Sequence, residues 1–163
     1  MYTTVEQVSH FVDLRSMPDF SGLEGILEEH LPKLEKDFDL ADYGPGNGVK
    51  TAYLAHLLQE LRPTTEEREV HLIDYNEFVL QVAEKVIRKL TDGLPVSISS
   101  ADPIDLGDHH STRKRKDRSR LHFLLGQTIG NFKDPLPVAA KLNRSMKKGE
   151  YLVVEGFDRN PED

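Results

Sequence analysis

An acidic residue followed by alternating glycines is the arrangement in this chain with the clearest chemical meaning. Asp42 ends an apolar run, and Gly44, Gly46 and Gly48 follow it just before a segment of helical character. Glycine lets the backbone turn tightly, and it lets a ligand lie against bare main chain beside a helix N-terminus. The loop therefore predicts a binding site at the end of a strand, with a turn that needs glycine only for tight packing as the alternative.

A second carboxylate ends the next apolar run. Asp74 directly follows Val70 to Ile73, and a carboxylate at the tip of the second strand is where nucleotide-binding folds hold ribose hydroxyls. The alternative is that Asp74 caps the helix that follows, although Asn76 is also placed to do so. Together the glycine loop and Asp74 predict a site for a cofactor that contains a nucleoside.

Two known phosphate-binding loops fit the glycine run only in part. A dinucleotide fingerprint, Gly-x-Gly-x-x-Gly, would need glycine where Val49 stands. A P-loop would end in Gly-Lys-Thr, and the chain has Lys50-Thr51 but again Val49 in place of the glycine. An acidic residue at the entrance of the turn suits a positively charged ligand better than a polyphosphate, so a P-loop hydrolase is the third-ranked hypothesis.

Composition limits the classes of protein that this chain can belong to. Its 163 residues fit one domain with a real core. The absence of cysteine excludes a disulfide scaffold, thiol catalysis and cysteine metal sites. A net charge of −7 weighs against nucleic acid as the main partner. Because no signal-like start and no apolar run of about 18 residues occurs, we expect a cytoplasmic protein with no membrane contact.

The periodicity of apolar residues predicts alternating strands and helices. Helices of about 12 residues between strands imply an α/β fold with a doubly wound, mostly parallel sheet and helices on both faces. We expect strands at 38–43, 70–74, 95–99, 121–125 and 151–155 and helices at 48–61, 76–90 and about 135–147.

The residues before the first strand have helical spacing as well. Segments 4–14 and 20–36 predict two helices, the second kinked or divided at Pro32. The chain thus divides into N-terminal helices at 1–37 and a cofactor-binding domain at 38–163, which we expect to form one structural domain.

In such a sheet, ligands bind beyond the carboxyl ends of the strands, where the strand order reverses. Asp42 and its glycines follow the first strand, Asp74 ends the second, Asp102-Pro103 follows the third, and a stretch ending in Asn131 follows the fourth. Asp102 as a simple turn residue and Asn131 as a helix-entry residue remain alternatives. The shared location nevertheless favours one common site more strongly than any single motif does.

Several of these motifs together resemble one known family. They are Gly44-x-Gly46 followed by Lys50-Thr51, then Asp74, and above all the stretch Gly-Gln-Thr-Ile-Gly-Asn-Phe at 126–132. This combination resembles the histidine-specific S-adenosylmethionine-dependent methyltransferases, which trimethylate the α-amine of histidine. The resemblance implies the Rossmann-like fold of class I methyltransferases with S-adenosyl-L-methionine as cofactor.

The resemblance also implies roles for individual residues. It places Gly44, Lys50, Asp74, Asp102 and Pro103 on the cofactor, with Asp74 at the ribose and Asp102 near the adenine. It further implies that Asn131 contacts the amino-acid substrate. Because the sulfonium already activates the methyl group, we expect the protein to position its reactants, and we single out no catalytic side chain and no metal.

The resemblance covers about residues 38–157, which correspond to the cofactor-binding core of the family. Family members continue after the fifth strand into a substrate domain and further strands, so we expect this chain to lack the last strands of the sheet. The predicted function is N-methylation of an amino acid, histidine-like, or of a small amine. The alternative is a cofactor-binding module or fragment that is inactive without a missing substrate domain or a partner. We also expect the chain to self-associate when it is concentrated.

The remaining polar features favour structural interpretations. The basic run within 113–120 is typical of a solvated surface loop in an acidic protein. His109-His110 lacks the spaced partners of a metal site. His71 and His122 lie in apolar runs and are interpreted as histidines packed in the sheet.

Overall fold

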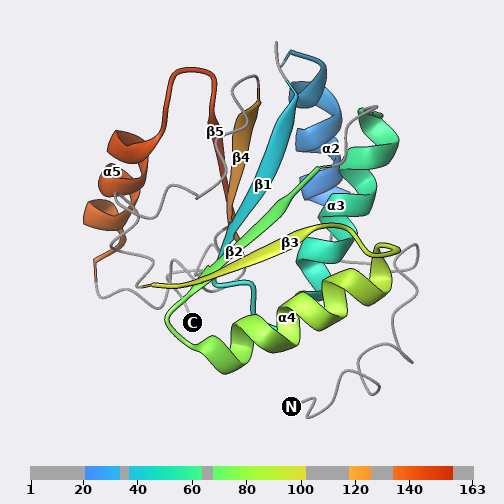
Figure 1. Cartoon of the computed structure of the whole chain (residues 1–163). Helices are drawn as coiled ribbons and strands as arrows, with labels where there is room; N and C mark the ends of the chain where they lie inside the picture. The colour runs from blue at the N-terminus through green and yellow to red at the C-terminus, as the bar shows by residue number, and fades with distance from the viewer. Residues whose placement is uncertain (1–20, 34–36, 64–67, 102–117, 126–133, 156–163) are drawn as a thin grey trace, which may run out of the picture.

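The computed structural model describes residues 21–33, 37–63, 68–101, 118–125 and 134–155 (Figure 1). Within them, five strands form one sheet in the order β3-β2-β1-β4-β5, and every neighbouring pair is parallel. The predicted α/β sheet is therefore confirmed. The strands are β1 Phe38–Tyr43, β2 Val70–Asp74, β3 Val96–Ser100, β4 Ser119–Leu124 and β5 Tyr151–Val154.

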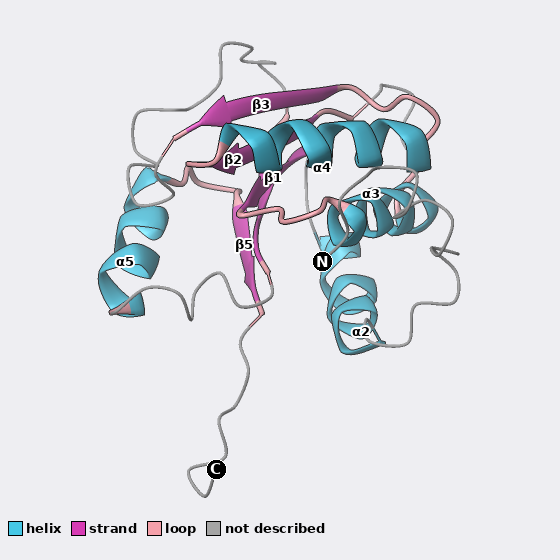
Figure 2. Cartoon of the chain, turned by 90° about the horizontal axis from the view of Figure 1, so that it is seen from below, coloured by secondary structure: helices cyan, strands magenta, loops and turns pink. Residues whose placement is uncertain are grey.

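Helices cover both faces of this sheet (Figure 2). On one face lie α2 Ser21–His30, with the short 3-10 helix η3 Leu31–Lys33 after it, α3 Val49–Leu61 and α4 Glu77–Leu90; on the other lies α5 Pro135–Ser145. The α-helix before the first strand ends just ahead of Pro32, as the proline predicts. The other predicted helix, at 4–14, lies outside the described residues.

Local sequence signals explain where α4 begins and ends. Asn76 is the N-cap residue, and its Oδ1 accepts hydrogen bonds from the amides of Phe78 and Val79. After Leu90 the chain reverses at Gly93, whose φ is 88° and whose amide donates to the carbonyl of Arg88. The turn that leads from β2 into α4 is therefore fixed at the edge where the predicted site lies.

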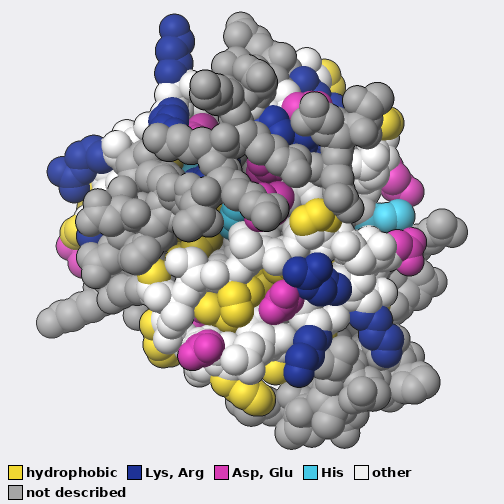
Figure 3. All heavy atoms as spheres, in the orientation of Figure 1, with side chains coloured by type: hydrophobic (Ala, Val, Ile, Leu, Met, Phe, Trp, Pro, Cys, Tyr) yellow, Lys and Arg dark blue, Asp and Glu magenta, His cyan; other side chains and the backbone are white. Residues whose placement is uncertain are grey.

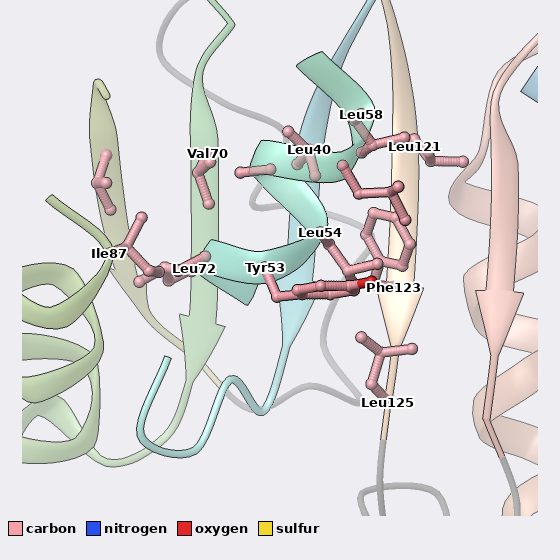
Figure 4. Close-up of a cluster of buried hydrophobic side chains, with 14 of the residues drawn as sticks. Leu40, Tyr53, Leu54, Leu58, Val70, Leu72, Ile87, Leu121, Phe123 and Leu125 are labelled. Atoms are coloured by element: carbon pink, nitrogen blue, oxygen red, sulfur yellow. The ribbon is translucent and has the colours of Figure 1, made fainter. Parts of the chain in front are cut away.

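The main core lies between the sheet and helices α2, α3 and α4 (Figure 4). Alternate residues of β1, β2 and β4 face these helices and are fully buried or nearly so. Each such side chain stabilises the fold by about 1.5–3 kcal/mol relative to an exposed one. The close-up labels the central members: Leu40, Tyr53, Leu54, Leu58, Val70, Leu72, Ile87, Leu121, Phe123 and Leu125.

The face that α5 covers mixes apolar and polar side chains. Tyr43 packs there with Val138 and Leu142 of α5. His122 is fully buried on this face, and His71 is partly buried in β2, so both histidines lie within the sheet as expected. His122 stacks on Tyr43 with ring centroids 5.9 Å apart. This face therefore contains hydrogen-bonded polar groups in addition to hydrophobic contacts.

Two kinds of feature are absent from the described residues: a helix that could span a membrane and a group of metal-ligating side chains. None of the described helices is long and apolar enough to cross a bilayer. Among the same residues, no three His, Cys, Asp or Glu side chains are grouped so that they could hold a metal ion. Figure 3 shows acidic and basic side chains interspersed with apolar ones over the described part of one face.

Candidate functional site

The strand order places the predicted site at one edge of the sheet. From β1 the chain proceeds outward through β2 and β3, and it then returns to the other side of β1 as β4 and β5. The order thus reverses between β1 and β4, and ligands bind beyond the carboxyl ends of the strands at such a point. The loop after β1 and the start of α4 lie at this same edge in Figure 1.

The glycine loop contains glycines of two kinds. Gly44, Gly46 and Gly48 all have positive φ, at 74°, 56° and 79°. A Cβ added at Gly48 would lie 2.8 Å from the backbone of Ala83 in α4, so glycine is required there for helix packing. A Cβ at Gly46 would meet no atom within 4 Å. Packing therefore explains Gly48, whereas Gly46 faces open space that a ligand can use.

Asp42 is a buried carboxylate with an unused acceptor. The residue is 2% exposed, and its Oδ2 accepts a hydrogen bond of 2.5 Å from Thr51 Oγ1. No donor within the described residues reaches Oδ1. Burial raises the pKa of Asp42 to about 6, although the hydrogen bond from Thr51, the charge of nearby Lys50 and the backbone amide of Tyr43 act to lower it. A buried acceptor without a partner needs an explanation, and a donor or cation on a ligand supplies one.

Lys50 lies in the first turn of α3 beside this carboxylate. Its Nζ is 2.6 Å from Oε2 of Glu155, the residue that directly follows β5. The amide of Glu155 donates to the carbonyl of Leu124, which holds Glu155 next to the end of β4. Glu155 was not predicted as a residue of this site. The only feature of the sequence that pointed to it is its position directly after the fifth strand.

Asp74 ends β2 at the same edge and is 9% exposed. Its Oδ1 accepts a 2.8 Å hydrogen bond from the amide of Asn76. Because Asn76 is the N-cap of α4, the interpretation of Asp74 as that cap is wrong. Two aromatic residues that follow it in the sequence, Tyr75 and Phe78, are 76% and 69% exposed.

Three predicted site residues, Asp102, Pro103 and Asn131, lie outside the described residues. The chain just before Asp102 is described, and the amide of Ala101 donates to the carbonyl of Asp74. The third strand therefore ends beside Asp74. The structure accordingly brings Asp42, Lys50 and the glycine loop together, and it adds Glu155 to them.

Comparison with protein families identifies the chain. Residues 22–163 match the model of the histidine-specific, S-adenosylmethionine-dependent methyltransferases. The chain belongs to this family. S-adenosylmethionine is accordingly the cofactor, and the unpartnered oxygen of Asp42 and the open space at Gly46 fit a ligand with an ammonium group.

Solved structures share the fold at low sequence identity. CalS10, an amino pentose methyltransferase from Micromonospora echinaspora solved with S-adenosylmethionine bound, has a TM-score of 0.56 at 15% identity and aligns with 99% of this chain. DesVI from Streptomyces venezuelae has a TM-score of 0.52 at 16% identity over 96% of the chain. The chain covers 59% of the length of each structure. A search of curated proteins found no match.

Proposed function

We propose that this chain binds S-adenosylmethionine at the carboxyl edge of β1 and β2 and methylates an amine nitrogen of a histidine-like amino acid or of a small amine. The observation that carries the proposal is the buried Asp42 Oδ1, which no described residue satisfies, beside the open space at Gly46. Because the chain belongs to a family of S-adenosylmethionine-dependent enzymes, we assign S-adenosylmethionine as the ligand of this arrangement.

Each described residue has a proposed role that its chemistry supports. Asp42 Oδ1 accepts a hydrogen bond from the ammonium of the methionine portion, and Lys50 faces the carboxylate of that portion. Asp74 accepts hydrogen bonds from the ribose hydroxyls. Its bond from Asn76 leaves it this capacity, because two carboxylate oxygens offer about four lone-pair sites.

Catalysis by this arrangement is mainly a matter of position. The bound cofactor supplies a methyl group that its sulfonium has already activated. The residues of the chain hold the reactants in line and exclude water. An α-amine has an ordinary pKa near 7.7–8.0, so part of it is neutral near pH 7 without a general base. Asn131 is the residue proposed to orient that amine, and no described side chain is assigned proton transfer.

A second proposal is that the chain acts only with additional structure. β5 is an edge strand of the described sheet, and its Tyr151 and Val154 are 46% and 43% exposed. Exposed apolar side chains on an unpaired edge favour pairing with another strand. We therefore propose that the substrate side of the site is completed by a further domain, a partner or a second copy.

Calorimetric titration with S-adenosylhomocysteine tests the cofactor site. Asp74→Ala removes a charge-assisted hold on the ribose worth about 1.5–3 kcal/mol, so affinity should fall about ten- to a hundredfold. Glu60→Ala, a surface change on α3, is the matched control and should bind as the wild type does. Equal affinity of Asp74→Ala and wild type would contradict the assignment, and binding of magnesium ATP instead would favour a P-loop hydrolase.

Transfer of a labelled methyl group to a pool of amino acids and amines tests the acceptor. Products are separated as mono-, di- and trimethylated species, and sedimentation at several concentrations follows self-association. If the substrate side of the site must be completed by additional structure, the chain should bind the cofactor, self-associate when concentrated and methylate histidine weakly. A monomer that methylates histidine rapidly would exclude the second proposal.

A further inference from the structure

The ion pair between Lys50 and Glu155 crosses the point where the strand order reverses. Lys50 belongs to α3, the helix after β1, whereas Glu155 follows β5 on the other side of β4. The two residues are 105 positions apart in sequence, and their charged atoms are 2.6 Å apart. The contact therefore connects the cofactor loop with the half of the sheet that carries the fourth and fifth strands.

This pair differs from an ordinary surface ion pair. Both side chains are about two-thirds buried, with 30% and 29% exposed. The pair between Arg88 and Glu84 is 3.0 Å long, but it joins successive turns of one helix. Such local pairs contribute little beyond helix stability. A short, partly buried contact between distant elements instead fixes the position of a long side chain.

The ammonium of Lys50 has a second carboxylate near it. Its charge acts on Asp42 and opposes the increase in the pKa of that carboxyl. Lys50 therefore lies in the field of carboxylates from β1 and from the end of β5. An ammonium has three donors, so a hydrogen bond to Glu155 leaves capacity for a ligand. The flexible stem would otherwise lose rotamer entropy when a ligand fixed it.

We infer that Glu155 is a positioning residue that holds Lys50 at the carboxyl edge of the sheet, ready to bind the carboxylate of the cofactor's amino-acid portion. The inference rests on the proposed function, because that function supplies the ligand. Fixing Lys50 in advance lowers the entropic cost of binding. Glu155 should therefore matter only for ligands that carry the amino-acid portion, and only while Lys50 is present.

Calorimetry on four proteins tests the inference: wild type, Glu155→Gln, Lys50→Met and the double variant. The ligands are S-adenosylhomocysteine and 5′-methylthioadenosine, which lacks the amino-acid portion. Glu155→Gln should lower the affinity for S-adenosylhomocysteine about three- to tenfold and leave the affinity for 5′-methylthioadenosine unchanged. In the Lys50→Met background the same change should have no further effect. Glu84→Gln, which breaks the Arg88 pair, should bind both ligands as wild type does.

The outcomes separate this inference from the proposed function. Absence of S-adenosylhomocysteine binding in the wild type would overturn both. If the wild type binds S-adenosylhomocysteine, three results would overturn the role of Glu155 alone. Glu155→Gln could bind with unchanged affinity, or it could weaken the binding of both ligands equally. The third result is that the change at Glu155 still weakens binding in the Lys50→Met background. If thermal unfolding shows that Glu155→Gln does not fold, Glu155→Asp should reproduce the ligand-selective pattern at smaller size, and equal weakening of both ligands would again overturn it.

Discussion

Two aspartates on the same strand have opposite surroundings. Asp39 and Asp42 both lie in β1 and are 6% and 2% exposed. Asp39 Oδ1 accepts a 3.0 Å hydrogen bond from the amide of Glu69 and lies 3.2 Å from Nε of Arg118. Asp42 has Thr51 on one oxygen, and no described donor reaches the other.

The difference separates a carboxylate that the fold compensates from the carboxylate that we propose binds the cofactor. Near the amino end of β1, the fold supplies Asp39 with a cation and an amide, so its charge is compensated. At the carboxyl end, burial raises the pKa of Asp42 to about 6 and one acceptor remains unused. Sites that await a ligand retain such destabilising features, which the rest of the core must offset.

The largest expected effect is on stability. Asp39→Ala removes the carboxylate that lies beside the guanidinium of Arg118, whose side chain is 4% exposed. Breaking a buried pair in this way should lower the free energy of unfolding by about 3–5 kcal/mol. Asp42→Asn replaces a buried charge by a neutral amide, so it should not lower the free energy of unfolding at pH 7, but it should weaken the binding of S-adenosylhomocysteine. Urea denaturation and calorimetry measure the two quantities, and equal destabilisation by both changes would remove the contrast.

The pH dependence of stability should reveal Asp42 directly. Its pKa is raised from 3.8 to about 6 by burial, so the folded protein holds a proton that the unfolded chain releases. Stability from this group is present below pH 4 and is lost as the pH rises to about 6, a change of about 3 kcal/mol. Denaturation at several pH values should show this loss in wild type and not in Asp42→Asn, and parallel profiles would contradict it.

Much of the fold was predictable because it depends on local patterns. Apolar alternation located all five strands, and Asn76 and Gly93 fixed the ends of α4. β4 begins at Ser119, before its predicted start, because its polar first residues pair with Phe38 and Asp39. Such pairing depends on which strand is the neighbour, and periodicity carries no information about that.

The sequence predicted the motifs of the candidate site but not the contacts that its side chains make. The position of Asp42 follows from an apolar run that ends at a glycine loop. Its unused oxygen depends on where α3 places Thr51. The approach of Glu155 to Lys50 depends on the order of strands on either side of β4. Roles for Asp102 and Asn131 stay predictions.

Two glycines of one loop give a smaller and more specific contrast. An added methyl group at Gly48 meets the Ala83 backbone at 2.8 Å with φ at 79°, so Gly48→Ala should destabilise the fold by about 2 kcal/mol. Gly46→Ala meets no protein atom and should cost about 1 kcal/mol through its positive φ alone. Gly46→Val should also prevent binding of S-adenosylhomocysteine. Normal binding by the valine variant would identify the loop as a packing turn.

The smallest expected effect concerns the polar groups on the α5 face. Tyr43 Oη and His122 Nδ1 are 2.9 Å apart, and His122 Nε2 faces Glu150 at 3.4 Å. Burial raises the pKa of Tyr43 to about 12, so its hydroxyl stays protonated and donates to the ring when Nε2 carries the imidazole proton. Tyr43→Phe removes this one bond and should lower the free energy of unfolding by about 1 kcal/mol.

The same variant distinguishes a structural role for these groups from a functional one. If they only stabilise the sheet, Tyr43→Phe should bind S-adenosylhomocysteine with wild-type affinity while its urea midpoint falls. Tyr43 ends β1 immediately before the glycine loop, so a displaced loop would appear as weaker binding. A loss of affinity as large as that of Asp42→Asn would show that the hydrogen-bonded groups beneath β1 also shape the cofactor site, and the contrast between the two ends of the strand would then be incomplete.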